Sequence, residues 1–252
     1  MIKVDRFAGN PILRADKNHD WEAEAVFNGC VVESDGKLYM VYRAVSKPQE
    51  VDSSNIELST IGLVVSNNRI DFNQRRQLIV PKFEWEKFGC EDPRITLFEG
   101  NYYIFYTALS TYPPTPEGIK VAVAVCRDFL KIDQKHQVTT FNSKAMALFP
   151  ERIDGKIAAI LTVDTDEPPA KIAVAFFDDI EQVWDFDYWQ KWHLSLPDHV
   201  IPSLRSLDDH VEVGAPPVKT NDGWLIIYSY ISNYFSSEKI FSIEAALLDL
   251  AD

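Results

Sequence analysis

Glu91 and Asp92 place two carboxylates side by side in the stretch Gly89-Cys90-Glu91-Asp92-Pro93-Arg94, with a permanent cation at its end. Because proline disfavours the helical conformation of the preceding residue, we expect an extended Asp92 at the beginning of a strand. Side chains two positions apart in a strand point to the same side, so Arg94 is expected next to Asp92. Two interpretations stay open: a structural ion pair that closes a turn, or Asp92 as a general acid at the mouth of a sugar-sized cleft.

Short apolar runs rich in Val, Ile, Phe and Tyr dominate the chain, and helical periodicity is weak. Turns that contain glycine separate pairs of such runs, at Asp35-Gly36, Glu99-Gly100, Asp154-Gly155 and Asp222-Gly223. Each pair predicts a β-hairpin. The hairpins recur about every sixty residues, which is long enough for one four-stranded propeller blade. The sequence therefore predicts an all-β propeller with four blade-like units, in preference to a sandwich.

Further strands are expected after three of the hairpins, at 61–66, 121–125 and 172–177. Each would be followed by an edge strand, at 68–72, 127–132 and 183–186. The fourth unit would end in a strand over 240–250. The passage 187–205 is the longest irregular one, and we expect it to carry a short helix over one face.

Composition limits the classes of function. The chain has 252 residues, of which 46% are hydrophobic and 12% aromatic, enough for a substantial core. A formal net charge of -13 argues against a nucleic-acid or anionic-membrane surface. Three widely spaced cysteines suit reduced, buried thiols. Residues 1–6 lack an apolar signal region, and no run approaches the roughly 18 apolar residues of a membrane span. We expect a soluble, cytoplasmic chain.

The five histidines have no metal-ligand spacing, and we expect them in loops or on the surface, with no metal site.

Seven landmarks run along the chain in a characteristic order. They are Asn10-Pro11-Ile12, Val26-Phe27-Asn28, Tyr42-Arg43, Glu91-Asp92-Pro93-Arg94, Leu148-Phe149-Pro150-Glu151, Gly214-Ala215-Pro216-Pro217 with Gly223-Trp224-Leu225, and Ala245-Ala246-Leu247-Leu248-Asp249-Leu250. In this order and at these separations the set resembles glycoside hydrolase family 130, the five-bladed β-propellers of β-mannoside phosphorylases and related hydrolases.

The resemblance implies a role for individual residues. Asp92 matches the catalytic aspartate of the family's Asp-Pro-Arg motif, the proton donor, and Arg94 of the same motif is expected to bind substrate. Asn28 and Arg43 match positions that hold the sugar whose bond is broken. Lys144 matches a lysine that binds inorganic phosphate. No cofactor is expected, and phosphate would be the co-substrate.

Inverting cleavage needs an acid on the leaving oxygen and a nucleophile on the opposite face of the sugar. Phosphate is already anionic, so a phosphorylase needs cations that gather it and no second carboxylate. The family is thought to pass the proton of the aspartate through a sugar hydroxyl. Because Lys144 and the set of landmarks fit the family's phosphorylases, the resemblance implies phosphorolysis of β-mannosides, with an oligosaccharide as the partner.

Two departures keep an inverting β-mannoside hydrolase open. The family's phosphorylases carry histidines where this chain has Thr162 and Ser229, and neither residue can carry positive charge. A hydrolase would need a carboxylate to activate water, for which Glu212 is a candidate. A non-catalytic sugar-binding propeller is a third alternative, with Trp85, Tyr103 and Trp224 as aromatic surfaces for sugar rings.

The family continues past the last landmark through a fifth blade and a C-terminal segment. We expect a single propeller domain over residues 1–252 that lacks this last blade. Such a propeller would close in a smaller circle, be completed by an extension, or keep an exposed edge. For partners we expect no nucleic acid and no membrane, and a homo-oligomer is compatible with the sequence.

Overall fold

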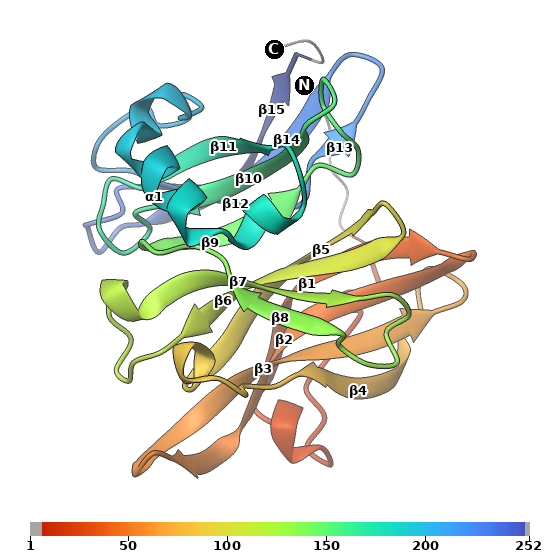
Figure 1. Ribbon diagram of the computed structural model, residues 1–252. Coiled ribbons are helices and arrows are strands. Elements are labelled where there is room, and N and C mark those ends of the chain that lie inside the picture. The colour runs from red at the N-terminus through yellow and green to blue at the C-terminus, as the bar shows by residue number, and fades with distance from the viewer. Residues whose placement is uncertain (1–6, 250–252) are drawn as a thin grey trace.

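Strands and tight turns make up most of the computed structural model, which describes residues 7–249 (Figure 1). The expectations for residues 1–6 and for Leu250 lie outside the described residues. Blade 1 contains β1 (Ala25–Ser34), β2 (Lys37–Val51), β3 (Ser54–Ser66) and β4 (Asn73–Ile79). Blade 2 contains β5 (Gly89–Phe98), β6 (Asn101–Leu109), β7 (Ile119–Cys126) and β8 (Gln134–Gln137). Blade 3 contains β9 (Ser143–Leu148), β10 (Ile157–Val163) and β11 (Lys171–Phe177), and blade 4 contains β12 (His210–Val213), β13 (Val218–Lys219), β14 (Trp224–Ser232) and β15 (Ile240–Leu248).

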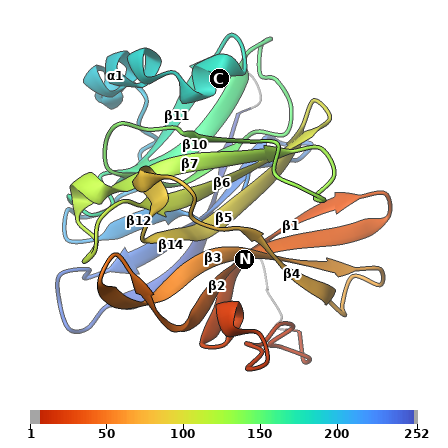
Figure 2. The same cartoon turned by 60° about the horizontal axis from the view of Figure 1, so that its bottom comes forward.

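Each blade is an antiparallel meander, as the hairpin spacing predicts. One parallel pair, Ser59 with Gly89, joins blades 1 and 2 into a continuous eight-stranded sheet. Blade 2 lies between blade 1 and the strands of blade 3 (Figure 2). The all-β propeller architecture is thus confirmed, with four blade-like units in the described chain.

The hairpin predictions are confirmed by backbone geometry. Asp35 and Gly36 have φ of 49° and 72°, and the corresponding residues of the Glu99-Gly100 and Asp154-Gly155 turns also have positive φ. Two consecutive positive φ values define the turn whose twist matches that of the flanking strands. These turns set the register of three blades.

The predicted edge strands are displaced or absent. Residues 68–72 and 127–132 form turns in which the carboxamide of Asn68 and the carboxylate of Asp128 accept backbone N–H groups two residues ahead. The edge strands follow these turns, as β4 and β8. In blade 3 residues 183–186 form no strand, because Asp185 caps helix α1 (Phe186–Leu194) by accepting from the N–H groups of Asp187 and Tyr188. Val200 instead pairs with the edge of β11, in a single antiparallel bridge with Ala173.

The helix expected within 187–205 is α1, which lies against blade 3 (Figure 1). Its Trp189 and Trp192 are buried in the apolar cluster shared by blades 2 and 3. The other helical turns are η1 (Asp20–Glu22), η2 (Glu84–Glu86), η3 (Pro116–Gly118), η4 (Glu181–Trp184) and η5 (Leu196–Asp198). No helix among the described residues is long and apolar enough to cross a membrane.

Apolar clusters fill the interfaces between successive blades. Phe105 and Leu161 belong to the cluster between blades 2 and 3, Ile61 and Ile104 to that of blades 1 and 2, and Ile226 to that of blades 3 and 4. The three cysteines are free and buried, as the sequence predicts.

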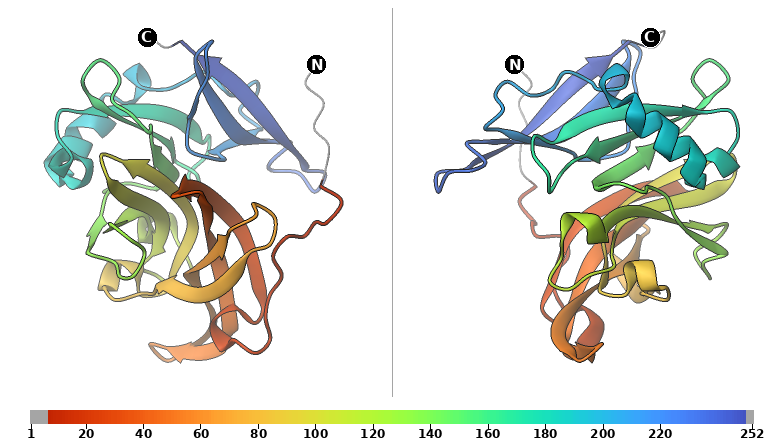
Figure 3. Two further views of the ribbon diagram at one scale, coloured as in Figure 1. Left: turned by 90° about the vertical axis from the view of Figure 1, so that its right-hand side faces the viewer. Right: turned by 60° about the vertical axis from the view of Figure 1, so that its left-hand side comes forward.

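The outer strand of blade 4 has an unpaired edge. Among the described residues, β15 pairs only with β14, and it lies at the outside of the molecule in both views of Figure 3. Phe241 and Ile243 on this strand are 72% and 83% exposed.

One buried ion pair fixes the segment that leads into Asp92. Glu86 is fully buried, and its carboxylate pairs with Lys135 while it accepts hydrogen bonds from Tyr106 and the backbone N–H of Lys82. The thiol of Cys90 donates to the same carboxylate over 3.4 Å. A buried charge that loses its partner is strongly destabilising, so this network ties η2 to blade 2.

Replacement of Glu86 by glutamine is expected to lower the free energy of unfolding by about 3 kcal/mol, because Lys135 would keep an unpaired charge in the core. Urea denaturation measures this. Glu84→Gln is the matched control, since the Glu84 side chain is 90% exposed, and its effect should stay within about 0.5 kcal/mol. Equal losses in the two variants would contradict the structural role of Glu86.

Candidate active site

The innermost strands of blades 1, 2 and 3 share an irregularity. Asn28 in β1, Asp92 in β5 and Ala145 in β9 have φ of 51°, 50° and 51°, and the strand register shifts at each of these points. Bulges of this kind redirect side chains and are common next to active sites. The expected extended Asp92 is therefore wrong: the bulge, and not Pro93, sets the direction of its carboxylate.

Asp92 receives two donors from blade 1. The carboxamide of Asn28 donates to Asp92 Oδ1 over 2.7 Å, and Arg43 Nη1 lies 3.5 Å from the same oxygen. In the described chain no protein donor is bonded to Oδ2. The side chain of Asp92 is 17% exposed, so one oxygen is held by the protein and the other is left for a substrate.

Arg43 also contacts the neighbouring carboxylate. Its Nη2 lies 2.5 Å from Glu91 Oε1, and its Nε donates to the hydroxyl of Ser59 over 3.0 Å. The guanidinium lies over the ring of Phe27, 5.0 Å from the centroid. Arg43 is thus fixed from three sides, and it bridges the two adjacent acids.

The carboxyl of Glu91 lies in a poorly hydrated environment. Burial raises its pKa above the usual range, and the negative charge of Asp92 adds to this. The positive charges of Arg43 and Lys144 act in the opposite direction. Lys144 of blade 3 therefore acts on the carboxyl of Glu91 in blade 2.

Arg94 does not pair with Asp92, so the interpretation as a structural ion pair is wrong. Its guanidinium donates to the carbonyl oxygens of Asp92, Pro93 and Val213, at 3.3, 3.1 and 3.2 Å. The residue is only 8% exposed, because the bulge at Asp92 breaks the alternation on which the expectation depended. The contact of Arg94 with substrate stays a prediction that this geometry does not support.

Lys144 is paired with an acid of its own blade. Its Nζ lies 3.0 Å from Asp166 Oδ1, while Asn142 and Thr165 donate to Asp166 Oδ2 over 3.1 and 2.9 Å. Burial alone would raise the pKa of Asp166, but the charge of Lys144 and these hydrogen bonds lower it below the ordinary value. Asp166 is therefore a fixed, ionised partner of Lys144.

The strand register places the two departures from the family pattern at the level of the site. Thr162 pairs with Lys144, and Ser229 pairs with Glu212. Thr162 is fully buried, and its hydroxyl accepts the N–H of Val213 over 2.9 Å. Glu212, whose side chain is 28% exposed, extends from β12 at the corresponding position of blade 4.

The aromatic residues expected for a sugar-binding module are elsewhere. Trp224 is buried in the cluster of blades 3 and 4, and Trp85 is stacked on Phe83 beside the Glu86 network. Tyr103 is 5% exposed, near the opposite end of blade 2 from Asp92. None of the three contacts the acidic pair.

One histidine lies differently from its expected place. His210 is 3% exposed at the beginning of β12, where it stacks on Tyr234.

A separate group of possible metal ligands lies near the start of the described chain: ligand atoms of Asp16, His19 and Glu22 are within 4.8 Å of one another. Since Glu22 already accepts hydrogen bonds from Tyr42 and Arg75, this group is explained as a structural network.

Sequence reasoning missed the roles of Glu91, Ser59 and Asn142 as neighbours of the expected site. Glu91 was visible as the residue before Asp92. Ser59 and Asn142 carry no local signal, because the strands that bring them to Arg43 and Asp166 are distant in sequence.

Comparison with known proteins places this geometry in a family. The family model described as beta-1,4-mannooligosaccharide phosphorylase, of glycoside hydrolase family 130, matches residues 4–252. A 1,2-beta-oligomannan phosphorylase of Thermoanaerobacter sp. (strain X514) is 28% identical over the whole chain and 78% of the relative. A beta-1,2-mannobiose phosphorylase of the same organism is 31% identical, over the whole chain and 79% of that protein.

A solved structure shares the fold. The beta-1,2-mannobiose phosphorylase of Listeria innocua, in complex with beta-1,2-mannobiose, superimposes with a TM-score of 0.72 at 22% identity. The similarity covers 98% of this chain and 79% of that one. The family model spans nearly all of the sequence, and a relative is 31% identical along the full length of this chain. This chain therefore belongs to glycoside hydrolase family 130.

Proposed function

We propose that this chain is an inverting β-mannoside phosphorylase in which Asp92 is the proton donor. The observation that carries the proposal is the meeting of Asp92 with Asn28 and Arg43, three residues from two blades that the family resemblance assigns to one site. The relatives named for β-mannoside phosphorolysis support the same activity. The substrate is a β-linked mannooligosaccharide.

The contacts of Asp92 suit an acid that donates its proton from one carboxylate oxygen while the protein holds the other. Asn28 and Arg43 hold Oδ1, so Oδ2 faces the sugar. In the inverting reaction a phosphate oxygen bonds to the anomeric carbon as the bond from that carbon to the leaving oxygen breaks. The proton of Asp92 reaches the leaving oxygen, by way of a sugar hydroxyl as the family resemblance implies.

Lys144 is the cation that we assign to phosphate. It lies on β9 and is near enough to act on the charge of Glu91. Its ammonium is already engaged by Asp166, so phosphate must compete with a fixed carboxylate for it. This competition predicts a phosphate affinity that is set by Asp166 as well as by Lys144.

A β-mannoside hydrolase is the second candidate, and two observations favour it. Three cations of this region, Arg43, Lys144 and Lys171, are each paired with a carboxylate, and Thr162 is buried where the phosphorylases carry a histidine. In a hydrolase, Glu212 on blade 4 would be the base that activates the attacking water.

The deciding assay is sugar release from β-1,2- and β-1,4-mannooligosaccharides with and without inorganic phosphate. We expect mannose 1-phosphate to form, and only when phosphate is present. Free mannose released at a rate that does not depend on phosphate would instead establish the hydrolase. Failure of both products to form with either linkage would remove both candidates and favour a sugar-binding module.

Asp92→Asn is expected to lower kcat/KM by about 100-fold or more, because the variant cannot donate a proton. Binding of the oligosaccharide, measured by calorimetry, should persist. Asp154→Asn is the matched control: Asp154 also has a positive φ, 48°, in a hairpin turn away from the site, and asparagine tolerates that conformation. Retention of normal activity by Asp92→Asn would contradict the assignment.

Lys144→Ala should raise the KM for phosphate by roughly 10- to 100-fold, the value of one charged hydrogen bond. Asp166→Asn should lower that KM, because it frees the ammonium from its competitor. Lys156→Ala, which removes an exposed lysine from a distant turn, should change nothing. If both site variants leave the KM for phosphate unchanged, Lys144 does not bind phosphate.

A further inference from the structure

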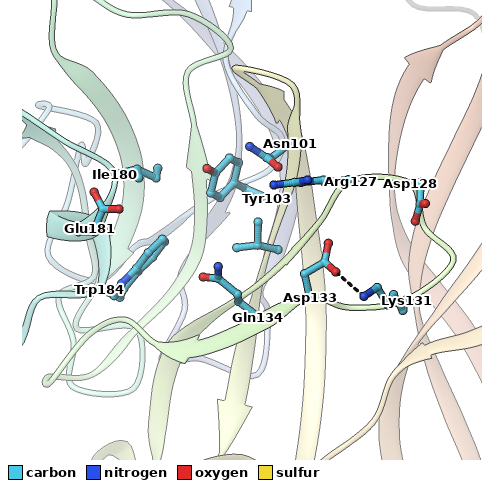
Figure 4. A pocket seen from close by; sticks show the side chains of 11 residues that line it. Asn101, Tyr103, Arg127, Asp128, Lys131, Asp133, Gln134, Ile180, Glu181 and Trp184 are labelled. Atoms are coloured by element: carbon cyan, nitrogen blue, oxygen red, sulfur yellow. Dashed lines mark ion pairs between the residues drawn. The ribbon is translucent and has the colours of Figure 1, made fainter.

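A polar hollow lies away from Asp92, between blade 2 and the segment that follows β11. Its volume is about 570 Å³, within the range of small-molecule sites. Figure 4 shows Asn101, Tyr103 and Arg127 on one side of the hollow and Glu181 and Trp184 on the other. Asn101 pairs across the hairpin with Phe98, which lies six residues after Asp92 in β5. This separation is roughly 20 Å, since a strand rises about 3.3 Å per residue.

Several polar groups in the hollow have no partner in the protein. Among the described residues, no hydrogen bond or ion pair engages the carboxamide of Asn101, the guanidinium of Arg127 or the carboxylate of Glu181. The carboxamide of Asn101 can both donate and accept hydrogen bonds, the guanidinium of Arg127 only donates, and the carboxylate of Glu181 only accepts. Groups of this kind can bind a ligand without first breaking internal contacts.

An aromatic surface completes the hollow. The indole of Trp184 stacks on the ring of His136 with centroids 4.3 Å apart and an angle of 5° between the planes. His136 therefore fixes the orientation of the indole before any ligand arrives, which reduces the entropic cost of binding. Tyr103, Val125 and Ile180 add apolar surface around it.

The charges of the hollow indicate the class of ligand. Arg127 and Lys131 are cationic and Asp128, Asp133 and Glu181 anionic, and Lys131 is paired with Asp133 over 3.2 Å. An anion would therefore meet more negative than positive side chains. Sugars instead present hydroxyls that both donate and accept, together with a face that packs on an aromatic ring.

We infer that this hollow is a second carbohydrate-binding site, which holds a neutral mannooligosaccharide on the Trp184 indole with Asn101, Arg127 and Glu181 as polar contacts. The class of sugar rests on the proposed function, whereas the existence of the site rests on the hollow alone. Because the site is far from Asp92, a short oligosaccharide does not fill both. It would retain a chain of the substrate near the enzyme between turnovers.

The test follows the indole N–H signal of Trp184 by NMR in the Asp92→Asn chain, where turnover is expected to be about 100-fold slower or more. Trp184→Phe identifies the signal among those of the six tryptophans. We expect β-1,2- or β-1,4-mannotriose to shift it in a saturable way. Arg127→Ala should weaken this binding about 10-fold, the value of one charged hydrogen bond. Arg69→Ala, an exposed arginine of blade 1, is the matched control and should leave it unchanged.

Two results would overturn the inference. One is a Trp184 signal that does not move with either mannotriose at concentrations well above those that saturate catalysis. The other is a signal that moves with inorganic phosphate and not with sugar, which would make the hollow an anion site. The kinetics of the unmodified chain are measured separately, so a failure of the proposed phosphorolysis would be visible without affecting this result.

Discussion

The buried guanidinium of Arg94 joins strands that are far apart in sequence. It donates to the carbonyls of Asp92 and Pro93 in blade 2 and to that of Val213 in blade 4. A buried cation is costly unless its donors are satisfied, and here carbonyl oxygens satisfy two of its nitrogens while Nε has no partner among the described residues. The arrangement persists because the same carbonyls require donors. The main chain at Asp92 is thereby coupled to blade 4, and so the site depends on the packing of the whole propeller.

The irregular backbone of the inner strands is the second constraint. Asn28 and Asp92 hold a positive φ, which asparagine and aspartate tolerate better than most residues. Ala145 holds the same conformation without that tolerance, at a cost of about 1–3 kcal/mol. The apolar clusters between blades supply the stability that sustains this strain. In return, the bulges at Asn28 and Asp92 turn these side chains away from the alternation of their strands, and the two side chains meet in a hydrogen bond.

Local sequence signals predicted the parts of the fold that depend on local geometry. The turn at Asp35-Gly36 needs two positive φ values, which this dipeptide adopts readily, and the hairpin is where it was expected. The edge strand expected at 183–186 failed because Asp185 is a helix cap, a signal that competes with apolar alternation. Asp92 was a candidate from its own sequence context, whereas Asn28 and Arg43 were found through the family resemblance. The pairing of Lys144 with Asp166 and the burial of Arg94 depend on bulges and tertiary contacts, and no local pattern contains either.

Arg43 and Lys144 are each paired with a carboxylate, and this pairing bears on how an anionic nucleophile would be gathered. In a chain with a net charge of -13, an unpaired cation would attract many small anions, whereas a paired one attracts only a ligand that outcompetes its partner. Phosphate can do so at Lys144 because it offers several strong acceptors, while Asp166 keeps the hydrogen bonds of Asn142 and Thr165 after it loses the ammonium. The carboxylate is therefore not left bare when the ammonium turns to phosphate. When phosphate binds, the ammonium of Lys144 would exchange its ion pair with Asp166 for an ion pair with phosphate. The pairing of Lys144 with Asp166 is therefore compatible with a phosphate site.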